Sequence, residues 1–232
     1  MVFIFVVMTF IGAIVIGNII RRRVLEKEAS RRVVRREPVM RLGPVAAVPA
    51  FEGALQFPKD VYFHKGHAWA KPGEGNEVKV GLDDFTQQVM GDIEGIEVPP
   101  VGSQLKQGEV AWKLRKGKRQ LKQLAPLGGT VVAVNEKVVK DPSLLNLSPY
   151  EKGWILKIRP KAFSEELPEL MDAFQFEIHF DRLKNKFRSS LSHQSLGVVY
   201  GDGGELVRGA GGILEDRLWK ILVTELFHTT PE

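Results

Sequence analysis

The stretch Val110–Pro126, VAWKLRKGKRQLKQLAP, has the pattern of a β-hairpin. Two sets of residues alternate along its first half, with Val110, Trp112 and Leu114 on one face and Ala111, Lys113 and Arg115 on the other. Because neighbouring residues of a strand point to opposite faces, one face of this strand is expected to be apolar and the other to face solvent. Gly117 follows, and glycine readily takes the positive φ of a tight turn. The sequence therefore predicts a hairpin whose turn projects Lys118 into solvent.

Short strand-like segments of the same kind continue from Phe57 to Arg159. Turn residues bound each of them, as in Glu77–Gly81, Glu94–Val98, Val110–Leu114 and Gly129–Asn135. Closely spaced short strands are typical of a β-sandwich or barrel rather than of an α/β fold. Asp83–Met90 interrupts them and is expected to form a short helix capped by Asp83. The fold class is therefore mainly β.

The net charge of +5 on the 232 residues comes from one segment of the chain. Residues 21–41 carry nine basic and three acidic side chains, whereas residues 1–20 carry no charge, so the remainder is close to neutral. The hydrophobic content of 44% excludes a disordered chain. The absence of cysteine excludes a disulfide framework, a thiol nucleophile, an iron–sulfur cluster and cysteine-ligated zinc.

Residues 2–20, VFIFVVMTFIGAIVIGNII, have the composition of a membrane span. A helix of this length extends roughly 28 Å, close to the hydrocarbon thickness of a bilayer. A signal peptide would have basic residues before the apolar run, whereas here three arginines follow it. We therefore expect a single-pass anchor in the inner (plasma) membrane, with the soluble domain in the cytoplasm. The basic residues among 21–41 are expected to contact anionic lipid headgroups.

Between residues 64 and 160 a series of motifs follows in order. They are His67–Trp69, Val80–Leu82, Val89–Ile93, Val98–Pro99, Val101–Gly102, Gly108–Glu109, Pro126, Gly129, Asn135, Pro142, Leu145–Asn146, Pro149–Tyr150 and Gly153–Ile155. In this order they resemble the glycine cleavage system H protein family. The resemblance, over about residues 60–173, implies a lipoyl-type domain, which is a flattened β-sandwich with a carrier lysine at a hairpin tip. It also implies a carrier that is not itself an enzyme.

The carrier lysine of the family lies eight residues before the proline that matches Pro126, and this position is Lys118. Its neighbours depart from the family's Glu-Ser-Val-Lys-Ala signature, because the chain has Arg115, Lys116, Gly117 and Arg119 at the other four positions. Between Lys113 and Lys122 there are six basic residues and no acidic one. Attachment enzymes of the family recognise this hairpin surface. Because the residues around Lys118 are basic here, several interpretations of the hairpin's role stay open.

The preferred interpretation is a membrane-anchored, non-enzymatic scaffold or docking component without a cofactor. Its hairpin then binds an acidic protein through basic side chains, namely Lys113, Arg115, Lys116, Arg119 and Lys122. The alternative is a functional lipoyl carrier of a glycine cleavage or related redox complex, with the arm on Lys118. A third interpretation is a solvated hairpin whose charges only deter edge-to-edge aggregation. Nucleic acid is not an expected partner, because the domain is near neutral.

Residues 163–232 are expected to form a small α+β extension. We expect helices at Glu165–Ala173 and Phe174–Phe180, and a hairpin whose strands are Leu196–Tyr200 and Glu205–Arg208. Leu214–Phe227 has the spacing of an amphipathic helix. The predicted parts of the chain are thus an anchor (1–20), a basic neck and linker (21–56), an H-protein-like domain (57–162) and the extension (163–232).

No catalytic or metal site is predicted. His64 and His67 are three residues apart, but they lie in a strand-like stretch, and His67 belongs to the motifs that carry the resemblance. The glycine-rich segments Gly201–Gly204 and Arg208–Gly212 lack the spacing and the Lys-Ser/Thr pair of phosphate-binding loops. Turn chemistry explains these glycines better than ligand binding.

Overall fold

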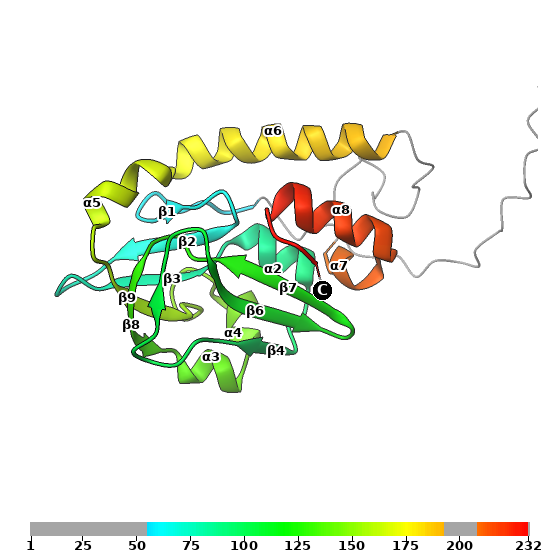
Figure 1. Ribbon diagram of the computed structural model, residues 1–232. Helices are drawn as coiled ribbons and strands as arrows, with labels where there is room; N and C mark the ends of the chain where they lie inside the picture. Colours follow the sequence, from blue (N-terminus) through cyan, green and yellow to red (C-terminus); the bar gives the residue numbers. More distant parts are fainter. Residues whose placement is uncertain (1–54, 193–207, 232) are drawn as a thin grey trace, which may run out of the picture. The chain divides into compact units, whose positions relative to one another are not determined.

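The computed structural model describes residues 55–192 and 208–231 (Figure 1). The expected anchor and neck, together with the linker up to residue 54, lie outside these residues. Among the helices of the described ranges, none is long and apolar enough to cross a bilayer.

Two antiparallel sheets form the body of the molecule. The larger sheet has six strands in the order β1-β2-β3-β9-β8-β5, and the smaller has three in the order β4-β6-β7. The larger contains β1 (Tyr62–Phe63), β2 (Ala68–Pro72), β3 (Val78–Leu82), β9 (Leu156–Arg159), β8 (Gly129–Val134) and β5 (Gln104–Leu105). The smaller contains β4 (Gly95–Glu97), β6 (Val110–Lys116) and β7 (Arg119–Leu124). The predicted β-sandwich is confirmed.

The two sheets share one apolar core. Val80 and Ile158 of the larger sheet belong to the same buried cluster as Trp112 and Leu121 of the smaller. The predicted alternation in β6 is correct for Trp112 but wrong for Val110, which is 45% exposed, and for Ala111, which is buried. The register with β7 shifts between Val110 and Trp112, and a bulge of this kind re-aims the side chains beside it.

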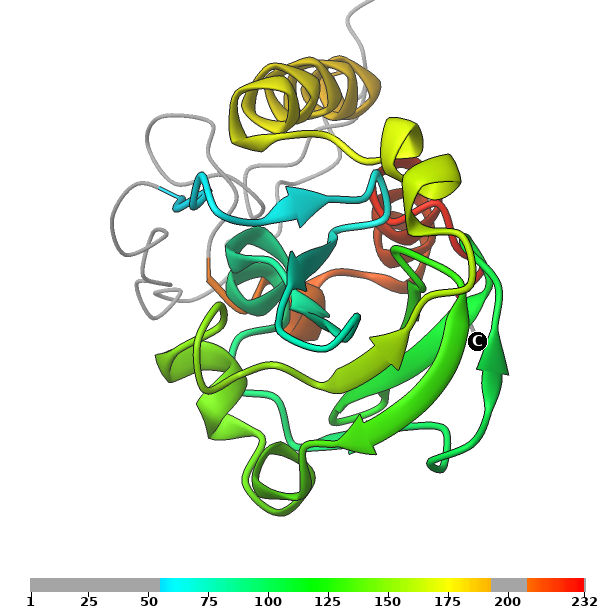
Figure 2. The ribbon, with the colours of Figure 1, turned by 90° about the vertical axis from the view of Figure 1, so that its left-hand side faces the viewer.

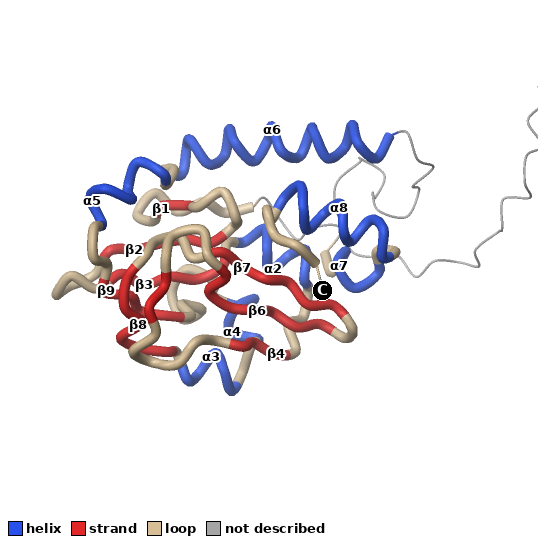
Figure 3. The backbone as a smooth tube through the Cα atoms, viewed as in Figure 1, coloured by secondary structure: helices blue, strands red, loops and turns tan. Residues whose placement is uncertain are grey.

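Short helices cover the ends of the strands. The predicted helix α2 (Asp84–Met90) begins as expected, because the Asp83 carboxylate accepts a hydrogen bond from the Thr86 backbone N–H at 2.8 Å. Two further helices, α3 (Glu136–Lys140) and α4 (Ser143–Leu147), lie between β8 and β9 in the sequence. Figure 3 shows the strands at the centre of the molecule and the helices around them.

The described part of the C-terminal extension is made of helices. The helix predicted for Glu165–Ala173 is wrong in its extent, because α5 (Phe163–Glu166) gives way to a short 3-10 helix, η1 (Leu167–Glu169). Pro168 lies in this 3-10 turn, where it cannot donate a backbone hydrogen bond. The helix expected at Phe174–Phe180 is confirmed as part of α6 (Ala173–Ser192), which lies alongside β1 (Figures 1 and 2).

The amphipathic helix expected near the C-terminus is also confirmed. It is α8 (Asp216–Leu226), and it follows the short helix α7 (Ala210–Ile213). One face of α8 is buried in the core shared by the two sheets, through Leu218, Trp219, Leu222, Val223 and Leu226. The expected hairpin at 196–208 falls outside the described residues except for Arg208, which lies in a turn before α7.

Candidate carrier hairpin

The hairpin of β6 and β7 ends in a two-residue turn. Lys116 pairs with Arg119 across the strands, so Gly117 and Lys118 form the turn. Gly117 has a φ of 53°, which suits the first central position of a tight hairpin turn. Its backbone N–H donates to the Glu94 carboxylate at 2.9 Å. The apex is therefore fixed to the chain that precedes β4.

Lys118 presents its amine at the apex. The side chain is 76% exposed, and Nζ forms an ion pair with Asp216 Oδ1 at 3.4 Å. The placement agrees with the prediction that the turn projects this lysine into solvent. An exposed amine on a rigid support is the arrangement that a prosthetic arm needs, because the arm can move while the strands stay paired.

Acidic residues from other elements lie among the basic residues of the hairpin. Lys113 Nζ is 4.0 Å from a Glu97 carboxylate oxygen, and Lys116 Nζ is 4.0 Å from one of Asp92. Arg115 is exposed, and Lys122 is half-buried. The sequence reasoning missed these acids because it counted charges only within the hairpin, whereas the neighbouring strand β4 and α8 bring others beside it.

Arg119 differs most from the expectation of an exposed, partner-binding residue. It is only 7% exposed, and its guanidinium lies 5.5 Å from the centre of the Trp219 ring. Nη1 donates to Asp216 Oδ1 at 2.8 Å, and Nη2 donates to the backbone oxygen of Leu214. Its contacts are thus made inside this chain, about a hundred residues away in sequence, and nothing in the local pattern signals them.

A buried histidine lies at the start of α2. His67 Nδ1 is 2.7 Å from Asp83 Oδ2, while Asp83 Oδ1 accepts from Thr86. Phe85 and Phe227 pack against the imidazole ring, so no open cleft reaches it. The hydrogen bond between His67 and Asp83 joins the start of β2 to the start of α2, so His67 has a structural role.

The other histidines of the described residues, His64, His179 and His228, also lack the features of a reactive site. Burial lowers the pKa of His64 to about 4, and burial likewise lowers the pKa of His179 and of His228. Neutral imidazoles can bind metals, but the described residues contain no group of three His, Asp or Glu side chains that could hold an ion.

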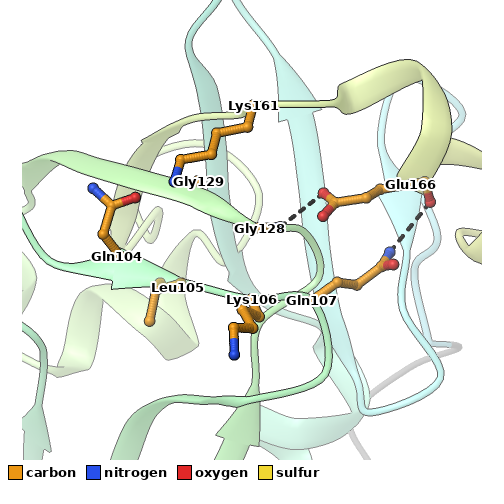
Figure 4. Close-up of a pocket in the computed structure, with 8 residues that line it drawn as sticks. All are labelled: Gln104, Leu105, Lys106, Gln107, Gly128, Gly129, Lys161 and Glu166. Atoms are coloured by element: carbon orange, nitrogen blue, oxygen red, sulfur yellow. Dashed lines mark hydrogen bonds between the residues drawn. The ribbon is translucent and has the colours of Figure 1, made fainter.

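A hollow of about 420 Å³ lies between β5, the start of β8 and α5 (Figure 4). Its one carboxylate, from Glu166, accepts a hydrogen bond from the Gly128 backbone N–H at 2.8 Å. The Gln107 side chain donates to the backbone oxygens of Pro126 and Glu166 at 3.0 and 3.2 Å. These polar groups join α5 to the sandwich, and the hollow contains no nucleophile paired with a base.

A β-sandwich that presents a single amine at the apex of a hairpin defines a class of protein, the lipoyl-type carrier domain. The chain belongs to one family of this class, because the family model "Glycine cleavage H-protein" matches residues 61–182. The resemblance seen in the sequence is therefore confirmed. Members of this family carry a group and are not themselves catalytic, so the chain is a non-enzymatic, H-protein-like carrier.

Two curated relatives agree with the family match, and one solved structure is also similar to part of this chain. The "Probable glycine cleavage system H protein" of Thermococcus gammatolerans is 37% identical over 131 residues, which cover 56% of this chain and 97% of the relative. The glycine cleavage system H protein of Anoxybacillus flavithermus is 38% identical over 123 residues, covering 53% and 95%. The crystal structure of the Mycobacterium marinum H protein has 27% identity and a TM-score of 0.48, covering 54% of this chain and 99% of that one.

Proposed function

We propose that this protein is a lipoyl carrier of a glycine cleavage complex, with lipoate joined to Lys118 through an amide bond. The observation that carries the proposal is the exposed amine at the apex of the hairpin, in a chain of the H-protein family. Lipoate, when attached, supplies a disulfide that can be reduced and can hold the transferred group. The chain supplies the fixed base of the arm.

Two contacts and the turn at Gly117 support this assignment of roles within the chain. Gly117 allows the tight turn, and Glu94 holds its backbone N–H at 2.9 Å. Arg119, directly after the carrier residue, is buried and bonded to Asp216. Motion of an arm on Lys118 would therefore leave its base in place, which is what transfer between several partner enzymes requires.

Intact mass spectrometry of the native protein tests the carrier function. We expect a lipoyl adduct on the chain purified from cells that lipoylate other proteins, and its complete loss in Lys118→Arg. The matched control is Lys113→Arg, which keeps the hairpin charge and should keep the adduct. An unmodified wild-type chain from such cells would rule out the carrier function.

A docking role for the hairpin is the second candidate, and the exposed guanidinium of Arg115 favours it. We propose that an acidic protein contacts Arg115 together with Lys118, while the half-buried Lys113, Lys116 and Lys122 contribute at the margin. Arg115→Ser should weaken binding of such a partner, and 1 M salt should weaken it in the wild type. Lys106→Ser, at another exposed lysine, is the control and should bind as the wild type does. If neither Arg115→Ser nor 1 M salt changed the affinity for the partner, the docking role would be contradicted.

We further propose that residues 2–20 tether the protein to the inner membrane, with the sandwich on its cytoplasmic side and residues 21–41 on anionic headgroups. The support is the uncharged apolar run followed by arginines. The full chain should sediment with membranes and resist a carbonate wash, whereas a chain that starts at residue 21 should be released. Recovery of the full chain in the supernatant would refute the tether.

A further inference from the structure

The C-terminal segment, residues 208–231, is docked on the flank of the carrier hairpin. It lies beyond the residues 61–182 that the family model matches. The segment enters beside the end of α2, where the Gly209 backbone N–H donates to the Gln88 backbone oxygen at 2.7 Å. A Cβ on Gly91 would lie 2.9 Å from Gly209 Cα, so the two backbones are in direct contact. Figure 1 shows α7 and α8 running from this point beside β6 and β7.

Two contacts fasten the C-terminal segment to β7. The buried guanidinium of Arg119 binds Asp216 and the backbone oxygen of Leu214, and it lies against Trp219. Farther along the strand, the Thr229 hydroxyl donates to the Lys122 backbone oxygen at 3.2 Å. A buried cation without acceptors is unfavourable, so the position of Arg119 depends on α8. The docking is therefore built into the folded state.

Asp216 is shared between Arg119 and the carrier residue. Its Oδ1 atom lies 2.8 Å from Arg119 Nη1 and 3.4 Å from Lys118 Nζ. The hydrogen bond from Arg119, together with the charge of Lys118, holds the pKa of the Asp216 carboxyl below its usual range. Asp216 also lies in the first turn of α8, where the helix dipole favours a negative charge. A carboxylate fixed by a buried arginine thus faces an otherwise exposed lysine.

We infer that Asp216 is a positioning residue for Lys118, which holds the amine on the α8 side of the hairpin apex and restricts its reaction with a modifying group. The inference deepens the proposed carrier function, on which it rests for the role of Lys118. An amine bound to a carboxylate has to leave it before it can attack an electrophile. The C-terminal segment therefore sets how readily the carrier residue is modified.

Competitive acetylation of the full-length chain with N-acetoxysuccinimide tests this inference. In this reaction the amine attacks the ester carbonyl, an amide forms, N-hydroxysuccinimide leaves and the amine proton goes to solvent. Peptide mass spectrometry gives the rate at each lysine. In Asp216→Asn at low salt, Lys118 should react roughly two- to fivefold faster, the range expected for an exposed ion pair. Asp216→Glu should restore the slow rate of Lys118. Addition of 1 M salt should raise the Lys118 rate in the wild type but not in Asp216→Asn.

Asp92→Asn is the matched control, because Asp92 pairs with Lys116 and with Arg208 of the C-terminal segment rather than with Lys118. It should leave the Lys118 rate unchanged. An equal Lys118 rate in the wild type and in Asp216→Asn would overturn the inference. So would an equal acceleration of Lys113 in Asp216→Asn, because that would indicate a loosened hairpin instead of a released amine. A chain that is never lipoylated would refute the carrier function. The acetylation test would still give a result for such a chain, because acetylation needs no lipoyl enzyme.

Discussion

His64 should make the stability of the fold depend on pH below neutrality. The side chain is 3% exposed, and burial lowers its pKa to about 4, whereas an unfolded histidine has a pKa of about 6.5. The folded state therefore keeps His64 neutral while the unfolded state takes up a proton. Because the unfolded state then binds more protons, the free energy of unfolding falls as the pH drops from about 6.5 to about 4. A difference of about 2.5 pKa units corresponds to about 3 kcal/mol across this window.

Urea unfolding at several pH values between 7 and 4.5 measures this effect. His64→Asn removes the titrating group, and its amide oxygen can accept the hydrogen bond that His64 Nδ1 receives from the Gly66 backbone N–H at 3.1 Å. We expect the variant to be less stable at pH 7 but to lose about 2 kcal/mol less than the wild type by pH 4.5. His228→Asn is the comparison, at a position with a φ of 54° that asparagine tolerates. His228 is more exposed than His64 and its pKa is also lowered, so this variant should reduce the pH dependence less than His64→Asn does. Parallel curves for the wild type and His64→Asn would refute the reasoning.

Three further substitutions test the packing by urea unfolding at pH 7. Trp219→Ala removes a buried ring that also lies against Arg119, and it should cost about 3–5 kcal/mol. Gly129→Ala should cost several kcal/mol, on the order of 3, because φ is 148° and the new Cβ would lie 2.8 Å from Pro160 Cα. Asp83→Ala should cost about 2 kcal/mol or more, since α2 loses its cap and His67 its hydrogen-bond partner.

Val101→Ala is the common control for these three substitutions, because Val101 is 60% exposed. It should change the free energy of unfolding by less than about 0.5 kcal/mol. Any of the three buried-site variants that unfolds at the same urea concentration as this control would contradict the packing described for its site.

Local patterns were enough to predict the hairpin and three of the helices. Gly117 between two alternating strands specifies a turn whatever surrounds it, and the spacing of apolar residues in α8 specifies a buried face. The bulge near Val110 was not predictable in this way, because it depends on the register with β7. Neither was the burial of Arg119, since its acceptors on Leu214 and Asp216 are distant in sequence. Contacts between remote segments set both features.

The shared core has a consequence for how this protein can be divided. Residues 61–182 match the H-protein family, yet Leu218, Trp219 and Leu222 of α8 belong to the same buried cluster as the sandwich strands. A fragment cut at the family boundary would leave the place of these side chains open to water. We therefore expect such a fragment to be less stable than the full chain, because the apolar surface that α8 covers would face water.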